Sequence, residues 1–581
     1  MVERRGQYVI PFSTRATIRR IVQRTIRRSP RVLIDTTTGR LHSKAEQEAA
    51  FMSLPVVNEL VSSMTTRVDR PLIKRQVKQF FQYVMFSHKW EENEPLFQLV
   101  LDATVSGLDN SPIYEKLKMF CQKVKEAGFK WAWSDTCCIN KDDHFVLQEA
   151  LVAMFEWYRD AAMVFVFLRG VRSSGKVGDL VKSPWNTRAW TLQEYVAAKV
   201  IRFYTEDWLP YLNLDIFNHK ESPEIIQEME RATKVSAQEL ASLRPGLNSI
   251  REKLCLASSR QTTLVEDAAY SLLGIFSVSG ISAIYGEGEK SLGRLLAHIL
   301  AVSGDTSILA WTGQSGGHNS CLPAHITVFT RPATWHLPQP IEDSEMAVKI
   351  TELRSSALDL DLAAKLYDRL NDLPAPWFAA SRMKLPCIAF KLPPMSLYRA
   401  RSGRVFRVDT PVFGMVEIKT KLDPTRSKSL YLVHPWLDVL LDREETQVGA
   451  FVEDEEDSEP SLPGTDDEDD PGASEGGNDS DEGEDDSDEE CEEGSPPLRE
   501  RRSPSPLASV DMAPMDRETR ALRLIARLRQ PFGALLLSVT SRRRRAVVYK
   551  RVAANSQITV QIRENVSLSD IMENVRILDV L

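Results

Sequence analysis

Short apolar runs alternate with amphipathic segments between residues 83 and 204, and this alternation restricts the chain to few folds. The apolar runs have the length of buried strands and occupy residues 83–86, 131–134, 163–168 and 200–204. Segments with apolar residues at helical spacing lie between them, at 113–128, 147–158 and 190–198. Such alternation favours an α/β fold with a parallel sheet covered by helices on both faces. Ser87 and Asp135 follow two of the strands, so we expect both at the carboxyl edge of the sheet, where these folds bind ligands.

The 581 residues exceed one ordinary core, so we expect several parts. They are a basic segment at 1–31, an α/β domain at 32–210 with its core at 83–204, a helical extension at 211–312, a β-rich region formed by 313–450 and 530–581, and an insert at 453–506. Strand-like runs after residue 530 predict that the tail pairs with residues 380–440 across the insert.

The net charge of −8 conceals two segments of opposite sign. Residues 453–493 contain 23 Asp and Glu residues and no Lys or Arg, so the remaining chain carries a net charge of +15. The insert has too few large apolar residues to offset the entropy of ordering, and we expect it to be disordered. Its acidic part serves either as a solvating linker or as a binding segment.

The first 31 residues hold nine arginines and a single acidic residue. Ile18, Val22 and Ile26 share one face of a predicted helix among these arginines. That face either binds an anionic membrane or a nucleic acid, or it docks on the chain's own domain or on the acidic tract.

Several protein classes are disfavoured. No apolar run is long enough to span a membrane, and no apolar stretch follows the N-terminal arginines as in a secretion signal. The seven cysteines form no CxxC pair, which indicates reduced thiols in the cytosol. Neither a zinc module nor an aromatic RNA platform is present, so we expect no specific nucleic-acid partner.

Other sequence patterns do not indicate a nucleotide-binding, hydrolase or metal site. The P-loop pattern is absent, and the stretch Gly313–Gly317 fits G-x-S-x-G without the helix that a hydrolase needs after its serine. Asp142, Asp143 and His144 are better explained as a solvated helix start than as metal ligands, so no metal site is expected.

Three sequence blocks lie in the predicted α/β domain. They are YVMFSHKWEENEPL at 83–96, WAWSDTCCINKDD at 131–143 and SPWNTRAWTLQE at 183–194. In this order and spacing they resemble the three blocks of the fungal heterokaryon-incompatibility (HET) domain. His88 stands where many members have Tyr, and Lys141 where the common motif has Gln.

Later segments, at 262–278, 284–300 and 303–311, resemble the helical extension of mushroom-type (basidiomycete) HET proteins, and 531–537 and 549–554 resemble their C-terminal region. The resemblance implies a role in allorecognition, in which fusion of incompatible hyphae triggers programmed cell death. It also implies action through protein partners or self-association. The implied location is the cytoplasm, with mitochondrial or nuclear association left open by the basic N-terminus.

HET domains also resemble TIR domains, which implies a TIR- or flavodoxin-like parallel sheet, followed here by the helical extension and the smaller β-rich region. In TIR enzymes that hydrolyse NAD, the catalytic glutamate lies on a helix in a Trp-x-x-x-Glu context. Trp190 and Glu194 have this spacing. The resemblance thus makes Glu194 the candidate catalytic residue, with NAD as a substrate and no cofactor required.

The candidate NAD cleft would be lined by Ser87, Lys89, Trp90, Asp135 and Trp190. Nicotinamide leaves as a neutral group, so one carboxylate that stabilises an oxocarbenium-like transition state suffices. The alternative is structural: Glu194 braces its helix with Arg188 as charge partner, and Trp190 is part of the core.

Overall fold

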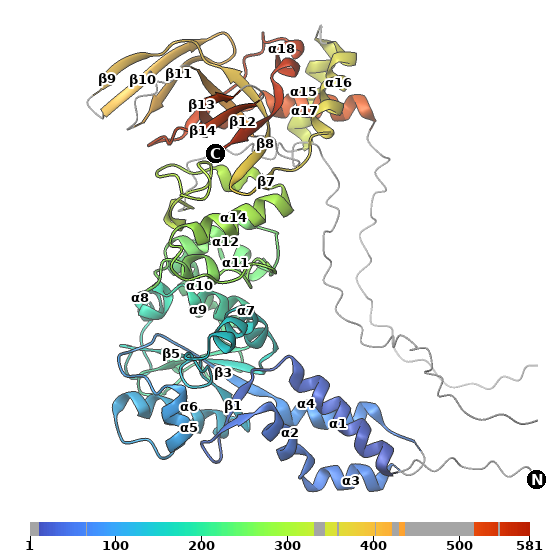
Figure 1. The fold of residues 1–581 in the computed structure, drawn as a ribbon, viewed down its shortest axis with the longest axis vertical. Coiled ribbons are helices and arrows are strands. Elements are labelled where there is room, and N and C mark those ends of the chain that lie inside the picture. Colours follow the sequence, from blue (N-terminus) through green and yellow to red (C-terminus); the bar gives the residue numbers. More distant parts are fainter. Residues whose placement is uncertain are drawn as a thin grey trace, which may run out of the picture. The chain divides into compact units, whose positions relative to one another are not determined.

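The computed structural model describes residues 11–64, 67–329, 343–356, 359–400, 403–420, 429–435, 516–543 and 546–581 (Figure 1). The helices and strands below belong to one compact unit, formed by Met1–Leu441 and Arg517–Leu581. The expected insert at 453–506 lies outside the described residues, as do the first ten residues of the basic segment.

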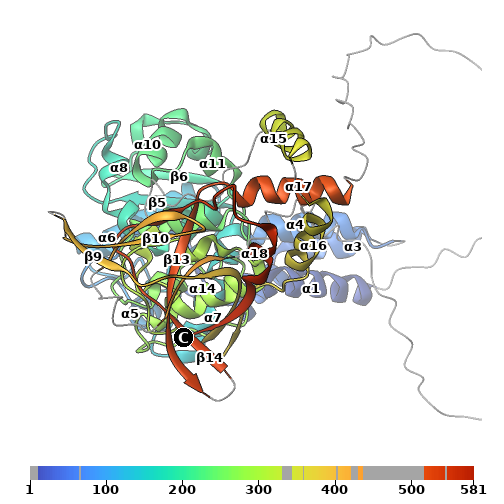
Figure 2. The same cartoon turned by 90° about the horizontal axis from the view of Figure 1, so that it is seen from above.

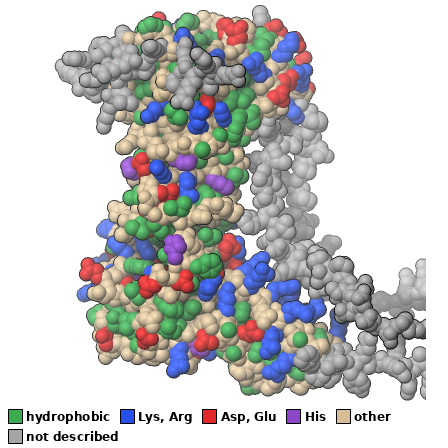
Figure 3. Space-filling view, in the orientation of Figure 1, with side chains coloured by type: hydrophobic (Ala, Val, Ile, Leu, Met, Phe, Trp, Pro, Cys, Tyr) green, Lys and Arg blue, Asp and Glu red, His purple; other side chains and the backbone are tan. Residues whose placement is uncertain are grey.

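Four helices form a bundle at the start of the chain: α1 (Pro11–Arg27), α2 (Lys44–Met52), α3 (Pro55–Ser63) and α4 (Arg70–Phe81). Ile18, Val22 and Ile26 of α1 are buried in a core that they share with Phe51 and Val77. The apolar face of α1 therefore docks on the chain's own bundle, which confirms one of the two alternatives. The other, that this face binds a membrane or a nucleic acid, is wrong. Basic side chains remain on the outside of the bundle (Figure 3).

A six-stranded sheet lies at the centre of the α/β domain, in the order β2-β1-β4-β3-β5-β6. Its strands are β1 (Val32–Asp35), β2 (Leu41–Ser43), β3 (Tyr83–His88), β4 (Trp131–Trp133), β5 (Met163–Leu168) and β6 (Ile201–Thr205). The last four run parallel, in the order 2-1-3-4 when numbered along the chain, so the parallel sheet predicted for 83–204 is confirmed. The short β1 and β2 add an antiparallel edge that the sequence did not predict.

Helices connect the parallel strands. They are α5 (Phe97–Ala103) and α6 (Pro112–Glu126) after β3, α7 (His144–Asp160) after β4, and α8 (Asp179–Lys182), the 3-10 turn η1 (Pro184–Thr187) and α9 (Trp190–Ala197) after β5. Figure 1 shows α5 and α6 on one side of the strands and α7 and α9 on the other. Cover on both faces explains why β3 and β5 are buried along their whole length.

Side chains and a loop cover the outer edge of β6. The amide of Ile201 donates to Asn218 Oδ1 at 3.0 Å. The amide of Phe203 donates to His219 Nδ1 at 3.0 Å. Burial lowers the pKa of His219 to about 4, so its ring stays neutral and Nδ1 stays an acceptor. The cover matters because an open strand edge invites pairing with other chains.

The helical extension is confirmed as mostly helix. It comprises α10 (Pro223–Thr233), α11 (Ala237–Ser242), α12 (Ile250–Ser258), α13 (Asp267–Tyr270) and α14 (Lys290–Ser303), with 3-10 turns η2 (Tyr211–Asn213), η3 (His219–Glu221) and η4 (Thr306–Leu309). The 3-10 turn η5 (Ile326–Phe329), beyond the predicted end of the extension, contacts α12. Apolar residues at helical spacing predict a helix over 265–276, but only α13 forms, and residues 271–277 are turns. Gly274 in this segment packs on α7, where an added Cβ would stand 2.2 Å from Phe155 Cβ.

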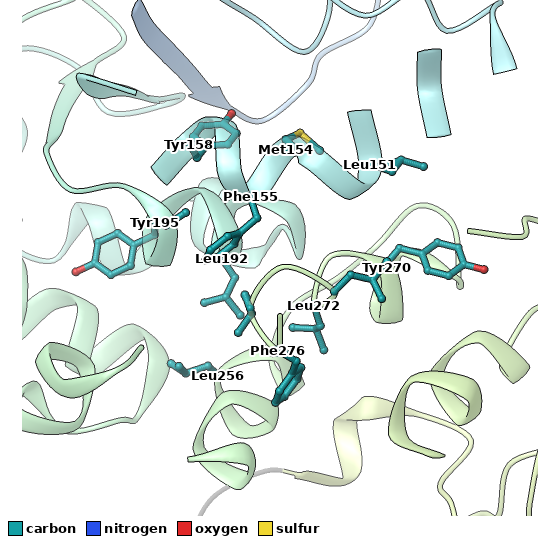
Figure 4. Close-up of a cluster of buried hydrophobic side chains, with 14 of the residues drawn as sticks. Leu151, Met154, Phe155, Tyr158, Leu192, Tyr195, Leu256, Tyr270, Leu272 and Phe276 are labelled. Atoms are coloured by element: carbon teal, nitrogen blue, oxygen red, sulfur yellow. The ribbon is translucent and has the colours of Figure 1, made fainter. Parts of the chain in front are cut away.

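One buried cluster joins the α/β domain to the extension (Figure 4). Phe155 comes from α7 and Leu192 from α9. Leu256 from α12 and Phe276 pack in the same cluster. The two parts therefore share one hydrophobic core, and α9 lies between the sheet and the extension.

The C-terminal region is rich in strands, as predicted. They are β7 (Trp377–Ala379), β8 (Arg382–Lys391), β9 (Ser396–Ala400), β10 (Gly403–Thr410), β11 (Gly414–Lys419), β12 (Leu430–Pro435), β13 (Phe532–Arg543), β14 (Ala546–Arg551), β15 (Ile558–Val560) and β16 (Val575–Val580). β12 pairs with β13 and β8 pairs with β16, so the predicted pairing of the tail with residues 380–440 is confirmed. β9, β10 and β11 form a separate small sheet.

Four further helices accompany these strands: α15 (Asp343–Ser355), α16 (Leu360–Asn371), α17 (Arg517–Leu528) and α18 (Leu568–Glu573). Figures 1 and 2 both place α17 beside α15 and α16, in agreement with their contacts. Among the described residues, no helix is both long and apolar enough to cross a bilayer.

Candidate functional site

Ser87 and Glu194 meet at the carboxyl edge of the sheet. Ser87 lies near the end of β3 and Glu194 on α9, one turn into the helix. Ser87 Oγ donates to Glu194 Oε2 at 2.5 Å and accepts from Trp185 Nε1 at 2.8 Å. The exposed fraction is 0% for Ser87 and 3% for Glu194, so the pair is closed to solvent. The first and third sequence blocks are thus joined by one hydrogen-bonded chain.

The carboxyl group of Glu194 sits in a mixed electrostatic environment. Burial raises its pKa to about 7 because the charged form loses hydration. Arg188, the hydrogen bond from Ser87 and the charge of Arg260 oppose this rise, while the negative charge of Asp135 adds to it. Near neutral pH the group therefore exists in both protonated and ionised forms.

Asp135 from the second block forms the other half of the site. Trp90 Nε1 donates to Asp135 Oδ2 at 2.7 Å. His88 Nε2 lies 3.4 Å from Asp135 Oδ1, and Arg188 Nη2 lies 3.6 Å from Oδ2. Burial alone would raise the pKa of Asp135, but His88, Arg188 and Lys141 outweigh it and hold the pKa well below its usual range.

Arg188 therefore pairs with Asp135 rather than with Glu194 among the described ion pairs. Its Nη1 also donates to the carbonyl of His88 at 2.6 Å, which links the third block to the end of β3. The structural alternative predicted that Arg188 is the charge partner of Glu194, but in the structure Arg188 forms its ion pair with Asp135.

A buried ion pair supports His88 from behind. Lys116 on α6 pairs with Glu94, and its Nζ lies 3.3 Å from Glu91 Oε1. His88 Nδ1 stands 3.6 Å from Glu94 Oε1. Burial and the charge of Lys116 lower the pKa of His88, so the imidazole is neutral. The His that stands here in place of the common Tyr thus lies between the carboxylates of Glu94 and Asp135, and neither of its ring nitrogens makes a hydrogen bond to a described residue.

Trp90 is the part of the site that reaches solvent, with 36% of its surface exposed. Lys141 Nζ lies 3.7 Å from the centre of its indole ring, and Arg188 Cζ lies 5.5 Å from it. Cations at these distances are attracted by the ring face. Burial lowers the pKa of Lys141. An aromatic ring with two cations beside it suits an anionic or ring-bearing ligand.

The structure brings four of the predicted site residues together and leaves two apart. Ser87, Asp135, Trp90 and Glu194 share one polar cluster. Lys89 is exposed beside Trp90. Trp190 turns toward the extension, where it contacts the carboxylate of Asp267 on α13.

Sequence reasoning missed several members of the site. Trp185 lies inside the third block, yet only its bond to Ser87 reveals its role. Tyr158 donates to the carbonyl of Phe86 at 2.9 Å and interacts with Glu194. Lys116 and Glu94 are fully paired charges in buried positions, which no pattern in the sequence marks.

The weaker motifs have structural roles. Asp143 caps α7 by accepting from the amides of Phe145 and Val146 at 2.9 and 3.2 Å. The G-x-S-x-G serine, Ser315, lies in a bridge with Pro323, and no helix follows it. Among the described residues, the structure holds no group of three metal-binding side chains.

Comparison with known proteins gives a family for the sheet-forming part of the chain. Residues 83–178 match the family model described as Heterokaryon incompatibility protein (HET). The chain is also similar to Vegetative incompatibility protein HET-E-1 of Podospora anserina, with 34% identity over 225 residues. This similarity covers 37% of the chain and 16% of that protein. No solved structure matches significantly. The predicted HET resemblance is confirmed for residues 83–178.

Proposed function

We propose that this chain is a heterokaryon-incompatibility protein whose HET domain triggers the death of incompatible fused cells. The observation that carries the proposal is the convergence of the three blocks on one buried polar cluster. Ser87 bonds directly to Glu194, while Asp135 reaches the same end of β3 through Arg188, which also binds the carbonyl of His88. Buried polar groups are costly unless they are satisfied, so such a cluster is typical of a functional centre.

Two supports come from outside the cluster. The HET match and the name of the similar Podospora protein both point to incompatibility. The segments at 262–278 and 284–300 further support assignment to the mushroom-type subfamily. We propose that protein partners or self-association in the cytoplasm carry the signal to the domain, and the mass of the purified chain in solution tests the second of these.

Regulated expression in a filamentous fungus tests the main proposal. Growth should arrest on induction of the parent chain and continue for Asp135→Asn at equal protein level, because the loss of this charge removes the ion pair with Arg188. Lys365→Gln removes only an exposed contact to Asp361 on α16 and should arrest growth like the parent. Continued growth with the parent chain, or arrest with Asp135→Asn, would contradict the proposal.

A second candidate function is NAD hydrolysis in the manner of TIR enzymes. The raised pKa of Glu194 at the carboxyl edge of a parallel sheet favours it. In this reaction the bond between nicotinamide and ribose breaks, water adds to the ribose carbon, and free nicotinamide, ADP-ribose and a proton result. Ionised Glu194 would stabilise the positive charge that develops on the ribose.

Burial sets a condition on this chemistry. Glu194 and Ser87 are both closed to solvent, so a substrate reaches the carboxyl group only when the side chains above it move aside. Trp90, with Lys141 and Arg188 beside it, stands at the solvent side of the cluster and would meet the ligand first.

Incubation of the purified chain with NAD and chromatography of free nicotinamide test the second candidate. The rate should rise as pH increases through about 7, since the ionised form of Glu194 is the active one. Glu194→Gln should abolish release at every pH. Release that persists in a folded Glu194→Gln protein, or no release from the parent between pH 6 and 9, would rule out this activity.

A further inference from the structure

We propose that Arg260 is a positioning residue for the HET site, and that the helical extension therefore completes the site by fixing the first turn of α9. Arg260 follows α12 and lies outside residues 83–178, which match the HET family. The inference rests on the proposed function only in taking Glu194 and Arg188 as working parts of the site.

The backbone of the extension runs beside the segment that leads into α9. Arg188 and Gln261 form a parallel bridge. The amide of Ala189 donates to the carbonyl of Gln261 at 3.0 Å, and the amide of Gln261 donates to the carbonyl of Thr187 at 2.6 Å. The segment that leads into α9 therefore forms backbone hydrogen bonds with the extension, as one strand does with its neighbour in a parallel sheet.

The side chain of Arg260 then binds the first turn itself. Its Nη1 donates to the carbonyl of Arg188 and to Thr191 Oγ1, both at 2.9 Å. Helix α9 has no side-chain cap at Ala189. A guanidinium only donates hydrogen bonds and cannot cap the free amides of a helix start, so Arg260 anchors this segment through the carbonyl of Arg188 and the hydroxyl of Thr191 instead. Arg260 holds the backbone of Arg188, and through the helix it holds Glu194 one turn further on.

Charge gives Arg260 a second link to the site. Arg260 is buried, with 6% of the residue exposed, and the negative charge of Glu194 acts on its guanidinium. A buried cation is expensive unless hydrogen bonds and an opposite charge compensate it. Arg260 therefore favours the ionised form of Glu194 while it holds the helix that carries this residue.

A second contact from the extension reaches the same helical turn. Asp267 on α13 interacts with the indole of Trp190 and accepts from Tyr285 Oη at 3.0 Å. The neighbouring Glu266 accepts from the amides of Gly286 and Gly288 at 2.8 Å each, which fixes the turn before α14. The extension thus contacts the start of α9 at two places, through Arg260 and through Asp267.

A matched pair of variants separates positioning from simple stabilisation. Arg251 on α12 is also a buried arginine of the extension, and it binds the carbonyls of Ser307 and Ala310, away from α9. Arg260→Gln and Arg251→Gln each remove a buried cation and its carbonyl contacts, so both should lower the melting temperature. Only Arg260→Gln should change the site.

The readout is the titration of Glu194 in the full chain labelled with 5-fluorotryptophan. Trp185 donates to Ser87, which donates to Glu194, so the fluorine signal of Trp185 should follow the ionisation of the carboxyl group. Trp185→Phe assigns the signal, and Glu194→Gln should remove its titration step. The other groups that act on Glu194, namely Arg188, Asp135 and Tyr158, are unchanged in both arginine variants.

We expect Arg260→Gln to move the midpoint upward from about 7, by about one pH unit, because an opposite charge is lost. Arg251→Gln should have the same midpoint as the parent. Arg260→Lys keeps the positive charge, so its midpoint should also equal that of the parent. Equal midpoints in the parent and Arg260→Gln, or an equal shift in Arg251→Gln, would overturn the proposal. If Arg260→Gln does not fold, Arg260→Lys provides the test instead. A midpoint in Arg260→Lys that differs from the parent by more than about half a pH unit would then overturn the proposed effect of the Arg260 charge on Glu194. The titration needs neither NAD cleavage nor cell death, so its result is independent of the proposed function.

Discussion

At the scale of single residues, Glu194 makes the stability of the domain depend on pH. Its pKa lies near 7 in the folded chain against an ordinary value of 4.5. The folded state therefore binds a proton that the unfolded state releases between these values, and this contribution to stability is lost as pH rises through 7. Ser87 still has a carbonyl oxygen to donate to when the residue is replaced by glutamine.

We therefore predict that Glu194→Gln is more stable than the parent chain above pH 7 and nearly equal to it at pH 5. One pKa unit corresponds to about 1.4 kcal/mol, so the gain at pH 8 is on the order of 3 kcal/mol at most. Thermal unfolding of both proteins at pH 5 and pH 8 measures it. Glu59→Gln, an exposed carboxyl change on α3, serves as the control. A variant that is destabilised equally at both pH values would show that Glu194 is ionised throughout.

Part of the site could be predicted from residue types and spacing. Ser87 lies near the end of β3 and Asp135 follows β4, and the carboxyl ends of parallel strands meet at one edge, so their proximity was predictable. Arg260 was not, because it comes from a different part of the chain and its hydrogen bonds go to the carbonyl of Arg188 and the hydroxyl of Thr191, which no sequence pattern marks.

At the scale of elements, the edge of β6 depends on one neutral histidine. The pKa of His219 is about 4 in the folded chain against 6.5 ordinarily, so the unfolded state binds more protons between these values. The stability that His219 supplies is present above pH 6.5 and is lost as pH falls toward 4. Below that pH, the protonated ring cannot accept from the amide of Phe203.

We predict that His219→Ala lowers stability at pH 7 by about 1–3 kcal/mol, because a buried amide loses its acceptor. The difference from the parent should shrink as pH falls from 6.5 to 4. Chemical denaturation at a series of pH values measures both effects, and His325→Ala, at an exposed site, is the control. A constant difference across this range would mean that His219 does not act as a neutral acceptor.

The elements differ in how well local patterns predicted them. β3 to β6 follow from apolar runs, since strands buried on both faces are apolar throughout. β1 and β2 are three or four residues long and join the sheet only as an antiparallel edge, too short for a periodicity. The helix expected at 265–276 ends at Tyr270, and Gly274 in the turns that follow packs directly against Phe155, a long-range contact that helical spacing does not encode.

At the scale of the whole molecule, the tail is an integral part of the fold. β13 pairs with β12 and β16 pairs with β8, across a wide gap in the sequence. Arg551 at the end of β14 donates to the carbonyls of Leu309 and Trp311 at 3.0 and 2.7 Å, which ties the tail to the extension. Each of these pairs closes a long loop, and loop closure carries an entropic cost that grows slowly with length.

This arrangement leads to a prediction about the connection between Pro435, where β12 ends, and Arg517, where α17 begins. Deletion of 453–506 shortens it roughly threefold and removes none of the described pairings. The cost of closure should fall by about 1 kcal/mol, since it scales as (3/2)RT times the logarithm of loop length. We therefore expect the deleted protein to melt cooperatively, at the same temperature as the parent or a few degrees higher. Truncation after residue 543 removes β14, β15 and β16. It should abolish the cooperative thermal unfolding of the C-terminal β-rich region. Cooperative melting that disappears on deletion of 453–506 would instead make this segment part of the folded structure.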